Sequence, residues 1–173
     1  MRIVAGRWRG RRIEAPPGRA VRPTLDRVRE AWMSILQRDL PGSRVLDLFA
    51  GSGALGLEAL SRGAARADFV ENDPRTIRIL QKNIDTLEPG DVLTIHRSDA
   101  LTFVKTIEPK TYDIAFADPP YAGGAASALA EVWLKKPFAR ILSVEHDARE
   151  TLAGAHETRR YGSSAITFYR SED

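Results

Sequence analysis

The sequence predicts an α/β fold in which a mostly parallel sheet carries helices on both faces and ends in an antiparallel strand. From residue 44 onward, short apolar segments typical of strands alternate with helical patterns, and such alternation builds parallel sheets. The last two strand-like segments meet across Gly162, Ser163 and Ser164, which is typical of an antiparallel hairpin at a sheet edge. Two short extended segments on either side of residues 6–10 are expected to pair as an N-terminal β-hairpin extension.

The hydrophobic spacing predicts the order of the elements. The first is an amphipathic helix that begins near Thr24 and ends before Pro41, with Arg27, Arg29 and Arg38 mostly off its apolar face. Strands are expected at residues 44–49, 67–71, 92–97, 112–117, 140–144, 157–161 and 165–169. Helices are expected between them, at about residues 53–62, 75–87, 100–107, 124–136 and 147–152.

The composition is that of a globular domain. The chain has 173 residues, of which 43% are hydrophobic and 28% are charged, so it can bury a core without disulfides or metals. No cysteine is present, which excludes disulfide frameworks, thiolate metal sites and cysteine nucleophiles. No apolar segment approaches the ~20 residues of a membrane span, and the first residues lack a signal-peptide core. We therefore expect a cytoplasmic protein with no membrane partner.

Positive charge is concentrated at the N-terminus. Residues 1–30 contain nine arginines and three carboxylates, a net charge of +6, whereas the rest of the chain has 17 basic and 20 acidic residues, a net charge of −3. Such an end is a candidate site for binding a polyanion such as nucleic acid. We therefore expect residues 1–22 to form a basic arm and residues 23–173 to form the main domain.

The tryptophan of this arm has two interpretations. Trp8 lies among Arg7, Arg9, Arg11 and Arg12. An aromatic ring in such surroundings can stack on an unpaired base while the arginines hold phosphates. Alternatively, the ring packs the hairpin onto the main domain, and the sequence leaves both interpretations open.

A glycine-rich loop follows the first predicted strand. Gly51, Gly53 and Gly56 have the spacing G-x-G-x-x-G, a helix follows, and Glu71 ends the next strand twenty residues after Gly51. This layout is typical of a nucleotide-binding βαβ unit, in which glycines let the backbone approach the ligand and the acidic side chain accepts hydrogen bonds from ribose hydroxyls. We therefore expect a ligand that contains a nucleoside.

Asp47 distinguishes two such ligands, a dinucleotide and S-adenosylmethionine (SAM). It lies four residues before Gly51, where its carboxylate would repel a pyrophosphate and attract the ammonium and sulfonium groups of SAM. SAM is therefore the expected cofactor. Asp99, after the third strand, either accepts a hydrogen bond from the adenine amino group or caps the next helix.

The four residues after the fourth strand predict methyl transfer to an amino group. Asp118, Pro119, Pro120 and Tyr121 lie where an open α/β sheet binds ligands. The prolines keep the chain extended and leave two peptides without an N–H, while Tyr121 offers a ring face to a planar base. An exocyclic amine that donates to the Asp118 carboxylate and the Pro119 carbonyl would have a localised lone pair, ready to attack the SAM methyl group. This chemistry requires no metal.

Five motifs in this order resemble those of one bacterial enzyme family. They are Arg22-Pro23-Thr24-Leu25-Asp26-Arg27-Val28-Arg29-Glu30, Asp47-Leu48-Phe49-Ala50-Gly51-Ser52-Gly53-Ala54-Leu55-Gly56, Asp118-Pro119-Pro120-Tyr121, Glu145-His146-Asp147, and Tyr161-Gly162 with Thr167-Phe168-Tyr169-Arg170. Together they resemble the bacterial small-subunit ribosomal RNA guanine-N2 methyltransferases of the RsmD type, over nearly the whole chain. The resemblance implies a Rossmann-like class I methyltransferase sheet, SAM as the cofactor, and N2 of a guanine in 16S rRNA as the methyl acceptor.

The resemblance also implies roles for individual residues. The cofactor site would consist of Asp47, Phe49, Gly51, Ser52, Gly53, Glu71, Asn72, Asp99 and Ala100. The catalytic group that holds the base would be Asp118, Pro119, Pro120 and Tyr121. RNA would be bound by Arg7, Trp8, Arg9, Arg11, Arg12, Arg22 and Arg27. The expected partner is 16S rRNA in the assembled or assembling small ribosomal subunit, and the enzyme is expected to be a monomer without a metal.

Two other functions remain open at this point. The residues from Asp118 to Tyr121 also suit an adenine-N6 methyltransferase acting on DNA or RNA, although the chain leaves no room for a separate target-recognition domain of ordinary size. A non-catalytic nucleic-acid-binding module would keep the basic arm and a vestigial glycine loop. His146 is expected to be structural, because methylation of an amine does not require a histidine base.

Overall fold

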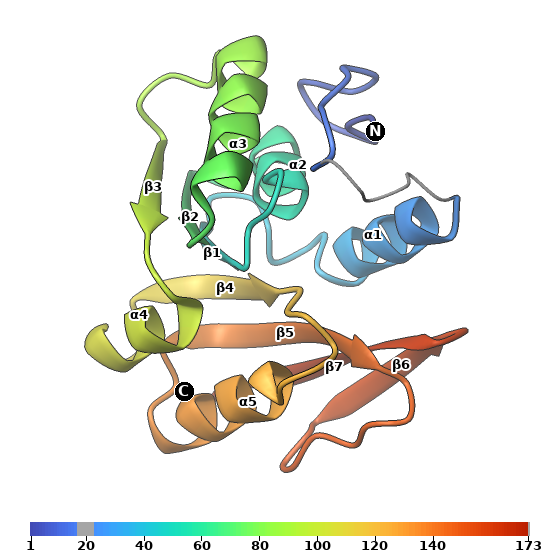
Figure 1. Ribbon diagram of the computed structural model, residues 1–173, viewed down its shortest axis with the longest axis vertical. Coiled ribbons are helices and arrows are strands. Elements are labelled where there is room, and N and C mark those ends of the chain that lie inside the picture. Colours follow the sequence, from blue (N-terminus) through green and yellow to red (C-terminus); the bar gives the residue numbers. More distant parts are fainter. Residues whose placement is uncertain (17–22, 173) are drawn as a thin grey trace.

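The computed structural model describes residues 1–16 and 23–172. In these residues, one seven-stranded sheet has the strand order β3-β2-β1-β4-β5-β7-β6 (Figure 1). Its strands are β1 (Arg44–Leu48), β2 (Arg66–Glu71), β3 (Leu93–Arg97), β4 (Tyr112–Ala117), β5 (Ala139–Asp147), β6 (Glu157–Tyr161) and β7 (Ser164–Arg170). The helices are α1 (Pro23–Ile35), α2 (Ala54–Ser61), α3 (Pro74–Leu87), α4 (Ala100–Thr106) and α5 (Ala125–Lys135). None of these helices combines the length and the apolar composition needed to cross a membrane.

Helices cover both faces of the sheet, which explains why the central strands β1, β2 and β4 are buried along most of their length. β1 pairs in parallel with β2 on one side and with β4 on the other. Val45 belongs to a core that α1, α2 and α3 build, whereas Leu46 and Leu48 belong to a second core that α4 and α5 build (Figure 1). The predicted α/β fold class is confirmed.

The C-terminal strands form the expected antiparallel hairpin. β7 pairs antiparallel with β5 and with β6. β7 is buried from Ser164 to Tyr169, whereas β6 lies at the sheet edge and alternates between exposed and half-buried residues. β7 is therefore part of the buried sheet, and β6 covers its outer edge.

The helix expected at residues 147–152 is absent, and this prediction is wrong. β5 stays extended as far as Asp147 because it pairs with β7 over its last seven residues. The carboxylate of Asp147 then accepts the backbone N–H of Arg149 at 2.9 Å, which closes a turn. Leu152 is the one fully buried residue in the segment that follows, residues 148–156, so no apolar face exists to hold a helix.

The first helix begins one residue earlier than expected. α1 starts at Pro23, whose fixed φ suits the first helical position, so Thr24 lies inside the first turn and is not the N-cap. Its apolar face packs across the sheet, where the indole N–H of Trp32 donates to the hydroxyl of Ser143 on β5 at 2.8 Å. This bond fixes α1 over the carboxyl half of the sheet.

The basic arm folds back on itself and packs against the main domain. An isolated antiparallel bridge joins Arg2 to Arg12, and the N–H of Ile3 donates to the carbonyl of Arg11 at 3.0 Å. Ile3, Trp8 and Ile13 are buried in the core that α1, α2 and α3 build. The expected hairpin is thus held by one bridge and by its apolar side chains.

A buried carboxylate on α2 holds the arm in place. Glu58 is 1% exposed, and its two oxygens accept the backbone N–H groups of Val4 at 2.8 Å and Ala5 at 3.1 Å. Arg62, one turn later, provides the compensating charge at 3.0 Å. Gly6 passes so close to Ser61 that a β-carbon would lie 1.8 Å from its carbonyl oxygen, so only glycine fits there.

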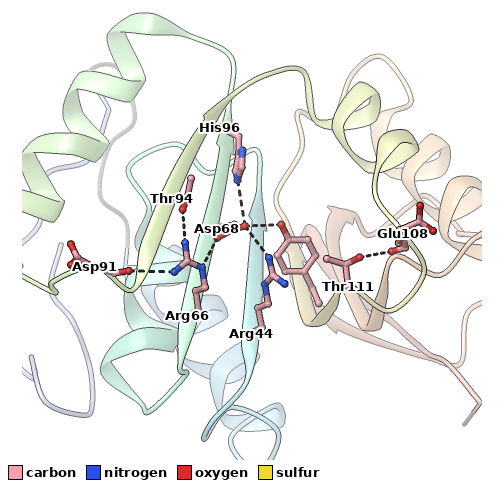
Figure 2. Close-up of polar contacts among 9 residues, drawn as sticks. Arg44, Arg66, Asp68, Asp91, Thr94, His96, Glu108 and Thr111 are labelled. Carbon is pink, nitrogen blue, oxygen red and sulfur yellow. Dashed lines mark hydrogen bonds and ion pairs between the residues drawn. The ribbon is translucent and has the colours of Figure 1, made fainter.

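A second buried carboxylate joins four strands (Figure 2). Asp68 on β2 accepts the hydroxyl of Tyr112 at 2.7 Å and lies 3.3 Å from Nε2 of His96. The guanidinium groups of Arg66 and Arg44 lie 3.6 Å and 3.8 Å from its oxygens. Burial, followed by the bond to Asp68, raises the pKa of Tyr112 above its ordinary value. Tyr112 therefore stays a hydrogen-bond donor at all physiological pH values.

We predict that Asp68→Ala lowers the free energy of unfolding by about 1–3 kcal/mol, because the buried hydroxyl of Tyr112 loses its acceptor. Urea denaturation measures this change. Asp91→Asn is the matched control, since Asp91 is exposed and its main-chain carbonyl, not its carboxylate, accepts from Arg66. Equal stability of the two variants would contradict the structural role of Asp68.

Candidate functional site

A cavity of about 390 Å³ lies at the carboxyl ends of β1, β2 and β4, a volume within the usual range for small-molecule sites. It contains seven of the residues that the sequence assigned to cofactor or catalysis: Asp47, Phe49, Gly51, Ser52, Glu71, Asp118 and Pro120. The carboxyl edge of an open parallel sheet is where such folds bind ligands. These seven residues therefore lie together at the edge of the sheet where the sequence analysis expected a ligand.

Asp47 is the most deeply buried acid of this cavity. It is 1% exposed, and its Oδ2 accepts the backbone N–H of Gly56 at 2.9 Å. Burial raises the pKa of Asp47 well above its usual value, and the nearby charges of Asp118 and Glu71 raise it further, although the bond from Gly56 opposes them. A β-carbon at residue 56 would lie 2.4 Å from the ring of Phe69, so glycine is required for this bond.

The glycine loop is tied to the end of β2. Oε1 of Glu71 accepts the backbone N–H of Gly51 at 2.9 Å. Oε2 of Glu71 accepts the N–H groups of Asn72 and Asp73, each at 2.9 Å. One carboxylate thus positions both the loop after β1 and the start of α3.

Phe49 carries backbone strain at the mouth of the loop. Its φ is 55°, in the left-handed region that non-glycine residues rarely adopt. Such strain is concentrated at functional sites, where the surrounding structure holds it. Nearby, Asn83 on α3 donates to the carbonyl oxygens of Ser52 and Glu14, each at 2.9 Å. The buried amide therefore links the glycine loop to the arm.

The predicted base-binding residues follow β4. Asp118 and Pro120 line the cavity, while Pro119 is buried beside them. Tyr121 is 46% exposed, and its hydroxyl shares a hydrogen bond of 2.7 Å with the hydroxyl of Ser164 on β7. Partial burial raises the pKa of Tyr121, so the hydroxyl stays neutral. The bond to Ser164 holds the Tyr121 side chain against β7, and Tyr121 does not line the cavity.

Several predicted cofactor residues do not line the cavity. Gly53, Asn72, Asp99 and Ala100 lie outside its wall. Asp99 caps α4, where its Oδ2 accepts the N–H and the hydroxyl of Thr102, each at 3.0 Å. The capping interpretation of Asp99 is therefore confirmed.

His146 is buried and bonded on both ring nitrogens. Nδ1 lies 2.9 Å from the carbonyl oxygen of Asp147, and Nε2 lies 2.7 Å from the hydroxyl of Thr167. It is 1% exposed and does not line the cavity. These contacts support the expected structural role.

The proposed RNA-binding residues differ in exposure. Arg9 and Arg12 are exposed on the arm, and Arg27 is exposed on α1. Arg11 uses one amino group to donate to the carbonyl of Thr86 at 2.8 Å. Arg22 lies outside the described residues.

Trp8 requires a correction. It is 6% exposed and belongs to the hydrophobic core, its backbone N–H donates to the hydroxyl of Ser61 at 3.0 Å, and the guanidinium of Arg7 lies 4.1 Å from the centre of its ring. The interpretation in which Trp8 stacks on a base is therefore wrong. The ring packs the arm onto the main domain, because burial removes a large apolar surface from water.

The predicted position of Arg29, off the apolar face of the first helix, is wrong. The residue is instead 8% exposed and lines the cavity. Its position three residues before the buried Trp32 was the signal that the sequence offered. Asp73 and Glu145 also line the cavity, although the sequence left their roles open.

The family model described as "Conserved hypothetical protein 95" matches residues 1–170. The chain belongs to this family. The protein described as ribosomal RNA small subunit methyltransferase D from Escherichia coli (strain K12) is 43% identical over 124 residues, which cover 72% of this chain and 62% of that protein. The protein of the same description from Haemophilus influenzae is 38% identical over 154 residues, which cover 85% and 80% of the two chains. The resemblance to the RsmD type is confirmed, although the chain matches less than two thirds of the E. coli relative's length.

Solved structures share the fold of this family member. A hypothetical protein from Thermus thermophilus is 30% identical, with a TM-score of 0.84 over 99% of each chain. The 16S rRNA N2 methyltransferase RsmC of T. thermophilus, in complex with AdoMet and guanosine, is 23% identical, with a TM-score of 0.69 over 90% of this chain and 45% of that one. At this identity the second similarity shows the fold alone. The predicted class I methyltransferase fold is confirmed.

We predict that Asp47→Asn stabilises the ligand-free protein at neutral pH and weakens binding of a cationic ligand such as SAM. The folded pKa of Asp47 lies above its unfolded value, so its ionisation costs folding free energy as the pH rises through the folded pKa. Thermal denaturation across pH should show equal stabilities below the unfolded pKa and a more stable variant at pH 7.

Asp73→Asn is the control, because the pKa of Asp73 is shifted in the opposite direction from that of Asp47. Hydrogen bonds from Thr76 and Arg75 lower the pKa of Asp73, so its charge favours folding once the pH exceeds the unfolded pKa. This variant should gain no stability at pH 7. An Asp47→Asn protein that is less stable than wild type at pH 7 would contradict the folding cost assigned to the buried Asp47 charge.

Proposed function

We propose that this protein transfers the methyl group of SAM to the exocyclic N2 of a guanine in 16S rRNA. The observation that carries the proposal is the placement of Asp118 and Pro120 in the same cavity as Asp47, Glu71 and the glycine loop. The proposed cofactor site and the proposed base site are therefore parts of the same cavity. The descriptions of the E. coli and H. influenzae relatives as small-subunit rRNA methyltransferases support the reaction and the substrate.

The charge of the cavity suits SAM. Asp47 and Asp118 interact unfavourably when both are ionised, as the raised pKa of Asp47 indicates. A bound sulfonium and ammonium would relieve this repulsion, whereas a pyrophosphate would increase it. Glu71, at the end of β2, is placed to meet ribose hydroxyls. The carboxylate of Glu71 also accepts backbone N–H groups, and these bonds hold the glycine loop beside the end of β2.

The residues after β4 would activate the guanine amine. Its two N–H groups donate to the Asp118 carboxylate and the Pro119 carbonyl, which localises the nitrogen lone pair. The nitrogen then attacks the methyl carbon in line, a C–N bond forms, and the C–S bond breaks with its electron pair remaining on sulfur, which leaves S-adenosylhomocysteine. The surplus proton on nitrogen passes to Asp118 or to water. Positioning and charge complementarity lower the barrier.

The arm would bind the RNA backbone. Its exposed arginines, Arg9 and Arg12, present positive charge beside a main domain with a net negative charge. Buried Glu58 and Asn83 fix the arm relative to the glycine loop. We therefore propose that residues 1–22 act as an RNA-binding arm on a catalytic domain of residues 23–173. The partner is the small ribosomal subunit or its precursor, and the protein acts there as a cytoplasmic monomer.

We predict that Asp118→Ala lowers methyl transfer to 16S rRNA by at least about 100-fold, because the amine loses its charged acceptor. SAM affinity should stay near the wild-type value. Transfer is measured with methyl-labelled SAM on small subunits from cells that lack the enzyme. Glu131→Gln, at an exposed position on α5, is the control. Mass analysis of the digested RNA identifies the product, and N6-methyladenine in place of N2-methylguanine would refute the proposed acceptor.

We predict that Arg9→Glu with Arg12→Glu weakens RNA binding and reduces the slope of log affinity against log salt by about one for each arginine that contacts a phosphate. Fluorescence titration at several salt concentrations measures both quantities. SAM binding should not change. Arg78→Glu, on the exposed side of α3, is the control for net charge. An unchanged salt slope would mean that the arm does not hold the RNA backbone.

A further inference from the structure

One guanidinium lines a cavity whose other charged side chains are acidic. Arg29 on α1 contributes to the cavity wall, and its side chain is 9% exposed. It is the one basic side chain among the described residues that line the cavity. The acidic lining residues are Asp26, Asp47, Glu71, Asp73, Asp118 and Glu145.

The bonds of Arg29 leave part of its donor set unused. Nη2 donates to the carbonyl oxygen of Arg2 at 2.6 Å and lies 3.6 Å from Oδ1 of Asp26. Nε is buried and has no hydrogen-bond partner among the residues that the structure describes. Buried donors in folded proteins are almost always paired. The described residues therefore leave part of the guanidinium without an acceptor, although the side chain lines the cavity.

The charge pattern of the cavity matches that of SAM, so this inference rests on the proposed function. SAM carries a sulfonium, an ammonium and one carboxylate. The acidic side chains suit the two cations, and Arg29 is the complementary group for the single anion. A phosphate of RNA is a poorer candidate, because the surrounding carboxylates would repel it. The exposed arginines of the arm meet phosphates without entering the cavity.

We propose that Arg29 binds the α-carboxylate of SAM through its guanidinium group and selects an amino-acid-bearing ligand. The bond between Nη2 and the Arg2 carbonyl holds the guanidinium in place. The neighbouring Asp26 keeps the guanidinium from being an unpaired buried charge before the ligand binds. Arg29 is therefore a specificity residue of the cofactor site.

Calorimetry with two ligands tests this role. Wild-type protein should bind SAM more tightly than decarboxylated SAM, which lacks only the α-carboxylate. Arg29→Gln should weaken SAM binding about 10- to 100-fold, the range of a charge-assisted hydrogen bond, and should change the affinity for decarboxylated SAM less than about twofold. Arg38→Gln removes an exposed arginine just beyond α1 and should leave both affinities unchanged.

Other outcomes overturn the proposal. Equal weakening of both ligands by Arg29→Gln would assign the residue to packing of α1, and circular dichroism with Arg29→Lys checks that the helix remains folded. Unchanged SAM affinity would place the carboxylate elsewhere. Weakened RNA binding with unchanged SAM affinity would assign Arg29 to the substrate. A wild-type protein that binds neither ligand refutes the proposed function, whereas one that binds both equally refutes only the role of Arg29.

Discussion

The parallel pairing of β1 with β2 and β4 is the constraint on which the site depends. Parallel strands end at the same edge of a sheet, so Asp47, Glu71 and Asp118 are brought together although they are far apart in the sequence. Burial raises the pKa of Asp47, and the charges of Asp118 and Glu71 raise it further. The backbone geometry therefore creates an acidic cavity that a cationic ligand would neutralise.

Hydrogen bonds from several segments stabilise the acidic residues and the glycine loop at this edge of the sheet. The backbone N–H of Gly56 bonds to Asp47, and Glu71 accepts N–H groups from both the glycine loop and the start of α3. Asn83 then connects the same loop to the arm. These bonds are local and directional, so the cavity is formed before any ligand binds. Preorganised charge of this kind is what methyl transfer requires, because it needs no reorganisation during the reaction.

Arginines of the N-terminal region do three different things. Arg29 turns into the cavity, Arg7 covers the ring of Trp8, and Arg9 remains exposed. Net charge alone cannot separate these roles, because each depends on the surface that a residue meets after folding. The arm is held by Glu58 through backbone groups, so these bonds do not involve its arginine side chains.

The sequence by itself determined the fold class, the order of the strands and helices up to α5, and the position of Asp47, Glu71 and Asp118 at the carboxyl edge of the sheet. These features follow from local spacing and from motifs that lie within a few residues. Only the tertiary structure decided that Trp8 is buried, that Arg29 lines the cavity and that β5 extends to Asp147, with no helix at 147–152. Each of these outcomes depends on contacts with distant segments, such as α2 for Trp8 and β7 for β5, and burial is set by those contacts rather than by the residue's own neighbours in the chain.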